Sequence, residues 1–445
     1  MPKPIKLRIT NEQLITPGGL ATVGHMLSQT SLYRDVDNIS VGAGKPDYAN
    51  SAAIAIAVAL MSQGKADFEA INEFHEEPEY YSEILGINGI PSEPTYRQRL
   101  KEISEKALPM ARKAIIEILA HPKVSFGLYK GYIPIDCDVT PLDNSGSKKE
   151  GVSWTYKGHD GYAPMQAYIG TQGYLLGEEL RPGSQNGQKD TGAFIKRSII
   201  NAKKLTDVKL LLRLDAGNDA KENRDICYSK ETHADFIIKR NLRHESIEEW
   251  VALAKEESEN VVVPREGKTV YTGSTYRFDG NRETRIVYEI TERTTNKHGQ
   301  ILLAPEYDVN TFWVSIPDED DGGWSDADVI QAYHDHATSE QFHAEIKTDM
   351  DLERLPSGDF NTNKLIWALG MIAYNILRLM GQVSLDKNDA PLKRPVKRRR
   401  IKTVIQNLIT IAVRVATHAR QTFLNLGRSN AWSNTYIRVH QALTG

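Results

Sequence analysis

The chain has 445 residues, 40% hydrophobic and 25% charged, which is enough apolar material for two or three domains with their own cores. No apolar run approaches the roughly 20 residues that span a bilayer, and the N-terminal MPKPIKLRIT lacks the apolar core of a secretory signal. We therefore expect a cytoplasmic protein without membrane segments. Cys137 and Cys227 are the only cysteines, too few for a disulfide framework or a four-cysteine zinc site, so both are expected to be reduced core thiols.

Charge is distributed unevenly along the chain. From Ala390 onward there is no acidic residue, and 11 Lys and Arg residues leave −14 on the first 389 residues, because the whole chain carries −3. A basic tail on an acidic body fits a polyanionic partner, since neutralised phosphates release counterions. A helical pattern from Val404 to Leu426 predicts that the charges sit on a folded segment. A solubilising or localisation tail is the alternative. The candidate phosphate contacts are Lys397, Arg398, Arg399 and Arg400.

Residues 1–122 are predicted to be helical. Ser51–Gln63 is alanine-rich and apolar, and Thr95–Ala120 alternates charged and apolar residues at helical spacing. Short helices of this kind suit a module that binds a DNA end, and a plain helical cap is equally compatible.

Residues 123–245 change to an α/β pattern. Val124–Thr140 is predicted to be extended, and its YIPIDCDVT segment places Asp136 and Asp138 on one strand face. Two carboxylates on one face require a cation or solvent. Two further extended segments and a helix at Gly192–Lys204 follow.

The next strand ends at a third acidic residue. VKLLLRLDAGND is an apolar run typical of a doubly covered strand, and it stops at Asp215, while DFIIKRN from Asp235 predicts a further strand. Open α/β sheets place their chemistry at such strand exits. An acid here is nevertheless more often a helix cap or turn former.

Residues 246–324 predict a β-strand insertion. VVVPREGKTVYTGSTYRF and RIVYEITERTT are typical of paired antiparallel strands. Trp313, in FWVSI, is expected in the core. Trp324 follows DEDDGG and is expected to be exposed, where it could stack on an unpaired base.

Helix resumes near Ser325, in a region taken as 325–385, with residues 386–445 forming the basic helical end. At 100° per residue from Tyr333, His336 falls at about −60°, Glu340 at about −20° and Lys347 at about −40°, so all four share one face. Glu345 lies about 140° from Glu340 and cannot point the same way.

The spacing Tyr, two residues, Arg, three residues, Glu, six residues, Lys characterises the catalytic helix in one branch of DDE transposases, and this helix matches it with His336 in the Arg place. Five more segments resemble that branch's insertion-sequence-1380 group, in the same order: IPSEPTYRQRL, IDCDVT, GYAPMQAYIG, LRLDAG and IKTVIQNLITIAVRVATHARQ. The chain thus resembles a DDE transposase of bacterial insertion sequences over nearly its whole length.

This resemblance implies a ribonuclease H-like mixed sheet flanked by helices, interrupted by the β-strand insertion, with helical N- and C-terminal regions. It implies that Asp138, Asp215 and Glu340 converge to hold two Mg²⁺ ions, with Mn²⁺ as a substitute. Asp138 is preferred to Asp136 because the family acid lies two residues before a Thr, here Thr140. Asp136 remains a substitute ligand. The DNA phosphates would face Tyr333, His336 and Lys347.

The resemblance also implies the partners: terminal inverted repeats and target DNA, held by a homodimer or larger synaptic assembly at the nucleoid. One alternative is a catalytically inactive or domesticated DNA-binding relative. Another is a ribonuclease H-like nuclease without transposition, which would not need the β insertion or both flanking regions. No Walker loop, dinucleotide fingerprint, zinc-finger spacing or nucleophile elbow occurs, which leaves nucleotide-driven and acyl-transfer enzymes little support.

Overall fold

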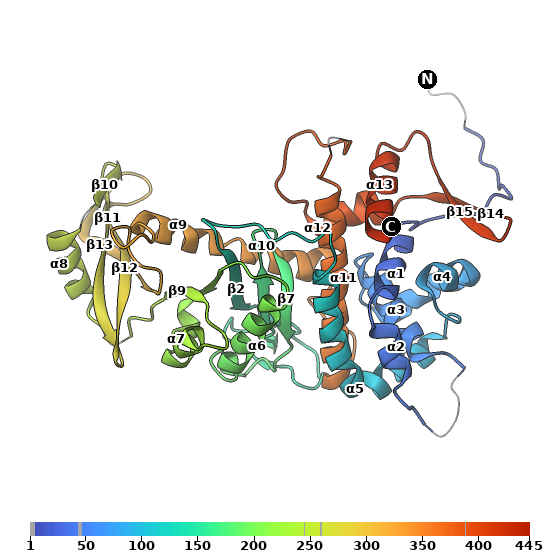
Figure 1. Ribbon diagram of the computed structural model, residues 1–445, viewed down its shortest axis with the longest axis horizontal. Helices are drawn as coiled ribbons and strands as arrows, with labels where there is room; N and C mark the ends of the chain where they lie inside the picture. Colours follow the sequence, from blue (N-terminus) through green and yellow to red (C-terminus); the bar gives the residue numbers. More distant parts are fainter. Residues whose placement is uncertain (1–4, 43–46, 244, 259, 388) are drawn as a thin grey trace. The chain divides into compact units, whose positions relative to one another are not determined.

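The computed structural model describes residues 5–42, 47–243, 245–258, 260–387 and 389–445. The chain forms two compact units (Figure 1). Unit 1 contains residues 1–124, 148–150 and 344–445, and unit 2 contains residues 125–147 and 151–343. Each unit is therefore assembled from segments that are far apart in the sequence.

The N-terminal part of unit 1 is helical, as predicted. The helices expected at 51–63 and 95–120 are confirmed as α3 and α5, and every residue of α3 is buried. An alanine-rich helix lets its neighbours approach closely on all sides, which explains why α3 can lie in the interior. The elements are α1 Leu20–Ser28, α2 Leu32–Asp37, α3 Asn50–Met61, the 3₁₀ helix η1 Phe68–His75, α4 Pro78–Leu85 and α5 Glu93–Leu119.

Helix α11, Phe360–Val383, packs along α5 and α3 in the core of unit 1 (Figure 1). Among the described residues it is the one helix whose length and composition would suffice to cross a membrane, and 94% of its most apolar stretch is buried in the structure. The sequence assigned this helix to the end of the catalytic core. A helix that is apolar nearly all round needs partners on every side, and the N-terminal helices supply them.

The C-terminal region differs from its predicted helix. Only α12 Ile401–Val404, the π-helix η4 Ile405–Ile409 and α13 Ser433–Thr444 are helical. Between them β14 Val413–His418 and β15 Gln421–Leu426 form a hairpin, which β1 Leu14–Ile15 extends to three strands.

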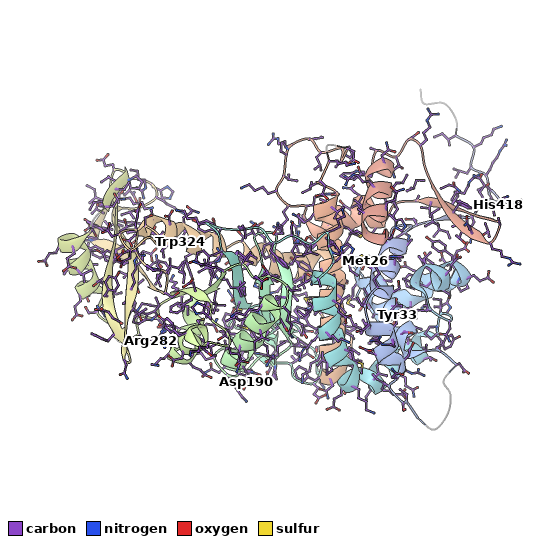
Figure 2. All side chains as sticks on the ribbon, viewed as in Figure 1. Met26, Tyr33, Asp190, Arg282, Trp324 and His418 are labelled. Atoms are coloured by element: carbon purple, nitrogen blue, oxygen red, sulfur yellow. The ribbon has the colours of Figure 1, made fainter. Side chains whose placement is uncertain are left out.

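The hairpin follows from the local sequence. VRVATH and QTFLNL alternate β-branched or apolar with polar residues at a period of two, which favours strands. Ala419 and Arg420 have φ of 50° and 63°, and a two-residue turn with positive φ at both positions matches the twist of antiparallel strands. His418 lies at the tip (Figure 2). The predicted helix from Val404 to Leu426 is therefore wrong beyond Ile409.

Unit 2 is built on a mixed sheet. Its first five strands are ordered β7-β6-β2-β8-β9, with β8 parallel to both β2 and β9, and β6 antiparallel to both β2 and β7. Helices flank this sheet (Figure 1). The arrangement confirms the predicted α/β class. The strands are β2 Ile133–Val139, β6 Met165–Ile169, β7 Tyr174–Glu179, β8 Leu210–Leu214 and β9 Asp235–Lys239.

Shorter elements of unit 2 surround the sheet. A second, three-stranded sheet has the order β3-β5-β4. These elements are β3 Leu142–Asp143, β4 Ser153–Trp154, β5 Asp160–Tyr162, α6 Thr191–Lys203, the 3₁₀ helix η2 Ala216–Asn218, α7 Lys221–Tyr228 and α8 Ile247–Glu257. Helix α6 confirms the helix expected at 192–204, and Cys137 and Cys227 are buried free thiols, as expected.

The predicted insertion is a set of long antiparallel strands: β10 Asn260–Arg265, β11 Lys268–Asp279, β12 Arg282–Thr295 and β13 Ile301–Val314. Strand β13 pairs with β9 through Phe312 and Lys239. The insertion therefore extends the core sheet to nine strands.

The helix expected to carry the family spacing is interrupted. Helix α9, Asp326–His336, is followed by a turn, then α10, Ser339–Ala344, and the π-helix η3, Glu345–Asp349. Around the turn, the backbone N–H of Thr338 and of Glu340 each donate to a carbonyl three residues earlier. This tighter winding invalidates the even 100° step assumed from Tyr333 to Lys347.

Candidate active site

Asp138 and Asp215 are brought together by two parallel strands. Cys137 of β2 pairs in register with Leu214 of β8, so the next residue on each strand lies at the same carboxyl edge of the sheet. Both aspartates line one cavity of about 720 Å³. Burial and the negative charge of Asp138 raise the pKa of Asp215. The two carboxylates predicted from the strand ends therefore share one site.

Asp138 is oriented by a hydrogen-bonded chain from β6 and α10. His343 Nε2 lies 3.3 Å from Asp138 Oδ2, while its Nδ1 lies 2.7 Å from Gln166 Oε1 and 3.1 Å from Tyr168 Oη. Burial would raise the pKa of Asp138, but the hydrogen bond and charge of His343 lower it. The sequence reasoning missed this chain. Its one signal was alternation, which places Gln166 and Tyr168 on the same face of a strand.

Asp215 is held by the turn that follows β8. Asn218 Nδ2 donates to Asp215 Oδ1 at 2.7 Å, and Asn218 N donates to the Asp215 carbonyl at 3.1 Å. A Cβ at Gly217 would lie 3.3 Å from both carboxylate oxygens. The glycine thus leaves the cavity side of the carboxylate open.

Asp136 forms a buried ion pair, and this contact argues against the prediction that it is a metal ligand. Arg213 Nε and Nη2 donate to its two oxygens at 2.6 and 2.7 Å, and His336 Nδ1 lies 3.0 Å from Oδ1. Burial would raise the pKa of Asp136, but the charges of Arg213 and His336 bring it to about 2. Its lone pairs serve a buried ion pair, so Asp138 is the better candidate.

The two α9 residues with predicted phosphate contacts have different surroundings. His336 is buried against Asp136, so the expectation that it faces DNA is wrong: it takes part in the ion pair beneath the site. Tyr333 packs on Phe312, with ring centroids 4.6 Å apart. Burial and the negative charges of Asp215 and Asp138 raise the pKa of Tyr333.

Glu340 is exposed on α10 and does not line the cavity that holds the two aspartates. In the part of the chain that the structure describes, no three or more Asp, Glu, His or Cys side chains are grouped to hold a metal ion. The structure thus brings together two of the three predicted carboxylates. Lys347 belongs to unit 1, where its Nζ lies 3.9 Å from Glu353 Oε2; its phosphate contact stays a prediction.

Two arginines of the predicted basic run form ion pairs within unit 1. Arg398 Nη1 donates to the Glu345 carboxylate at 2.9 and 3.0 Å. Arg400 donates to both oxygens of Asp349, at 2.8 and 2.9 Å. These pairs fasten the C-terminal segment to η3, and they correct the view of the run as a phosphate-binding cluster.

Arg399 is also structural. It is buried, its guanidinium lies 4.2 Å from the Trp432 ring centroid, and its Nη2 donates to the Thr403 carbonyl at 3.0 Å. The fourth of the basic residues predicted to contact DNA, Lys397, is exposed. Among the contacts of the described residues, its side chain has no ion pair or aromatic contact. Sequence spacing alone could not separate it from the others, because all four share the same charge.

Trp324 is buried, which corrects its predicted exposure. Only 6% of it is exposed, and its ring meets Tyr129 and Tyr132 edge-on, with centroids 5.4 and 5.3 Å apart. The loop before it folds back, with Trp324 N donating to the Pro317 carbonyl at 3.0 Å. Trp324 therefore lies in the core beside the start of α9 (Figure 2). Trp313 is buried, as expected.

Replacing Trp324 with Ala is expected to lower the free energy of unfolding by about 3–5 kcal/mol, because a buried aromatic would leave a cavity. Urea denaturation followed by circular dichroism measures this. A Trp324→Ala protein that unfolds like the wild type but loses DNA binding would restore the stacking role that the sequence suggested.

The cavity has a second wall that the sequence analysis did not single out. Besides the two aspartates, it is lined by aromatic, amide-bearing and basic residues: Trp154, Tyr156, Gln185, Asn186, Gln188 and Arg243. A signal was present in SWTY, where two aromatics alternate beside a turn, but alternation alone does not distinguish a site from an exposed edge.

Comparison with known proteins assigns the chain to a family through one sequence model. The sequence pattern described as "Transposase DDE domain group 1" matches residues 2–445. No curated protein matches the chain. Among solved structures, piggyBac transposase in a synaptic complex with hairpin DNA is similar at 10% identity and a TM-score of 0.42, over 89% of this chain and 80% of that one.

Proposed function

The chain belongs to the family of transposases with a group 1 DDE domain, and from that premise we propose that it binds the ends of its own insertion sequence, hydrolyses phosphodiester bonds there and transfers the cut strand. One observation carries the proposal: Asp138 and Asp215 lie at the carboxyl edge of two parallel strands and line the same cavity. Membership of the insertion-sequence-1380 group is part of the proposal.

The carboxylate pair fits a divalent cation. Asp138 raises the pKa of Asp215, so the two negative charges repel each other, and a cation between them would relieve that repulsion. Mg²⁺ prefers carboxylates together with water and phosphate oxygens. We propose that Asp138 and Asp215 hold Mg²⁺, or Mn²⁺ in its place. When bound in pairs, such ions activate a water nucleophile and stabilise the leaving oxygen.

The remaining residues of the site orient the pair. His343 keeps Asp138 Oδ2 turned toward α10, and Asn218 holds Asp215 Oδ1. A carboxylate held by such contacts has a smaller free-energy cost when it adopts its metal-binding geometry. Tyr333 would border the scissile phosphate from α9, because its hydroxyl is influenced by both aspartates.

Glu340 is proposed as the third acid on the basis of its position on α10. His343 on the same helix contacts Asp138, and residues three apart on a helix are neighbours on its surface. Glu340 is therefore one turn from a residue that touches the site, and its carboxylate is exposed to solvent. It would complete the metal-binding set when DNA is bound.

DNA backbone binding is assigned to exposed cations of the C-terminal region rather than to the structural arginines. Phosphate contacts need accessible Lys and Arg, since each neutralised phosphate releases counterions. We propose that these residues bind terminal-repeat and target DNA and that two or more copies of the chain pair the two ends. The proposed cations, which are exposed and outside the ion pairs of Arg400 and Arg414, are Lys393, Arg394, Lys397, Lys402, Arg420 and Arg428.

A cleavage assay tests the proposed function. We expect the purified protein to cut labelled duplexes that carry the DNA flanking its gene when Mg²⁺ is present, and to stop when EDTA is added, because the aspartate pair then lacks its cation. Binding measured by gel shift is expected to persist in EDTA. Binding without cleavage under both conditions would favour the inactive relative, and cutting at internal positions without end preference would favour the plain nuclease.

A further inference from the structure

Two exposed aromatic side chains flank the cavity of Asp138 and Asp215. Trp154 is 64% exposed and Tyr156 is 67% exposed, and both line that cavity. Single exposed aromatics are common on protein surfaces. Two on one wall of a cavity that also holds an acidic pair present flat apolar faces to whatever enters.

Both aromatics are held in place. Tyr156 Oη donates to the Val139 carbonyl at 3.0 Å, at the end of the strand that carries Asp138. Trp154 lies on β4, paired with Asp160 of β5. The turn after it is closed by Thr155, whose N and Oγ1 donate to the His159 carbonyl at 2.9 and 2.8 Å. The Tyr156 ring is thus held through its hydroxyl, while Trp154 is fixed through its backbone; an anchored ring loses little conformational entropy when a ligand stacks on it.

An anchored loop, residues 183–188, adjoins the aromatic pair and also lines the cavity. Ser184 N donates to Ser153 Oγ at 2.8 Å, next to Trp154, and the Gly187 carbonyl accepts from Thr191 Oγ1 at 2.5 Å. A Cβ at Gly183 would come within 2.1 Å of the Ser153 carbonyl oxygen, so only glycine lets the loop approach β4 this closely. The loop is therefore fixed against β4, next to the strand residue Trp154.

The loop and its neighbour supply the polar chemistry of the cavity. The amide-bearing residues Gln185, Asn186 and Gln188 belong to the lining, as does Arg243; Gln185 Nε2 donates to the Lys189 carbonyl and Asn186 Oδ1 accepts from Gln188 N, which leaves other amide groups for a ligand. Amides carry both donors and acceptors and can pair with the edges of bases. A guanidinium is suited to a phosphate.

We propose that this cavity receives one unstacked DNA base, with Trp154 as the stacking platform, the loop amides along the edge of the base and Arg243 at its phosphate. About 720 Å³ is within the range of pockets that enclose a small ligand. A base that stays paired and stacked in a duplex cannot enter such a cavity, so the ligand is either a single-stranded base or one flipped out of the helix. The inference rests on the proposed function, because the acidic pair would act on a bond near that base.

The test uses the full-length protein in EDTA and two DNA probes containing 2-aminopurine. One is a duplex with a four-nucleotide single-stranded overhang that carries the analogue, and the other is a blunt duplex with the analogue one pair from its end. We expect the fluorescence of the overhang probe to be quenched on binding, because the analogue stacks on an indole. Quenching of the blunt probe as well would identify flipping from the duplex as a source, and quenching of the overhang alone would identify single strands.

Variants assign the effect to the aromatic face. Trp154→Ala is expected to abolish the quenching and to weaken overhang binding by at least about 5-fold, as loss of base stacking does. Trp154→Phe is expected to restore much of that affinity. The matched control is Phe278→Ala, because Phe278 is 74% exposed and does not line this cavity; it should bind both probes like the wild type. Thermal unfolding should be unchanged in all three, since each replaced side chain is exposed.

The outcomes separate this inference from the function on which it rests. Unchanged quenching and overhang affinity in Trp154→Ala would overturn the inference, and Mg²⁺-dependent cleavage of an element end by the same variant would leave the proposed function standing. The inference would also be overturned if Trp154→Phe lost as much affinity for the two probes as Trp154→Ala does. The aromatic ring at position 154 would then make no contribution to binding. A wild-type protein that binds neither probe and cuts no end would overturn both.

Discussion

Replacing Asp138 with Asn is expected to reduce end cleavage on the order of 1000-fold or more, a loss typical of removing a central group of an active site. The amide keeps the shape of the side chain and a hydrogen-bonding group for His343, which lies 3.3 Å from Asp138 in the structure, but it lacks the charge that would hold Mg²⁺. Asp138 lines a cavity, so stability and DNA binding should remain near wild type. Initial rates of strand cutting and gel shifts measure the two properties.

Asp136→Asn is the matched control, because the same substitution two residues away should act on folding. It would leave the buried Arg213 without its partner charge, and breaking a buried ion pair costs roughly 3–5 kcal/mol. We expect a lower urea midpoint and, in the protein that remains folded, measurable cleavage. A stable, inactive Asp136→Asn protein beside an active Asp138→Asn protein would reverse the assignment of the two acids.

Glu340→Gln is expected to cause a cleavage loss of similar size, on the order of 1000-fold, with DNA binding and the free energy of unfolding preserved. Glu340 is exposed, so its carboxylate has little part in the fold, and the proposed function has it join the site when DNA is bound. Cleavage under Mg²⁺ measures the effect. Full activity in this variant would show that Asp138 and Asp215 work without the acid that the family spacing selects.

Glu345→Gln is its counterpart and should fail in a different way. The Glu345 carboxylate is 2% exposed and is paired with Arg378 and Arg398 in unit 1. Removing its charge is expected to lower the free energy of unfolding by roughly 3–5 kcal/mol, while cleavage by the folded fraction persists at low temperature. The helical-wheel comparison predicted that Glu345 does not point where Glu340 points, and the buried ion pairs give Glu345 a structural role. Normal stability combined with lost cleavage would instead make Glu345 part of the chemistry.

Much of the fold could be predicted because local patterns of apolar and polar residues determine its helices and strands. The apolar run that ends at Asp215 forms a central strand, and the alanine-rich segment forms the buried α3. The long antiparallel strands of the insertion pair as expected. Such elements depend on the spacing of side chains within about 10–15 neighbouring residues, which is visible in the sequence. The C-terminal hairpin was missed although its signal was also local: VRVATH and QTFLNL alternate at a period of two and pair with each other across a two-residue turn.

The two aspartates could also be predicted, because both stand where an apolar strand ends and parallel strands bring such ends to one edge. The roles of their neighbours could not. Asp136 is paired with Arg213 and His336, whereas Asp138 contacts His343 at the cavity; Arg398 is paired with Glu345 and Lys397 is exposed. The partners that bury and pair these side chains lie more than 50 positions away in the sequence. The sequence therefore determined which residues carry the candidate charged groups. The tertiary structure decided which of those groups are held in ion pairs and which remain accessible to a ligand.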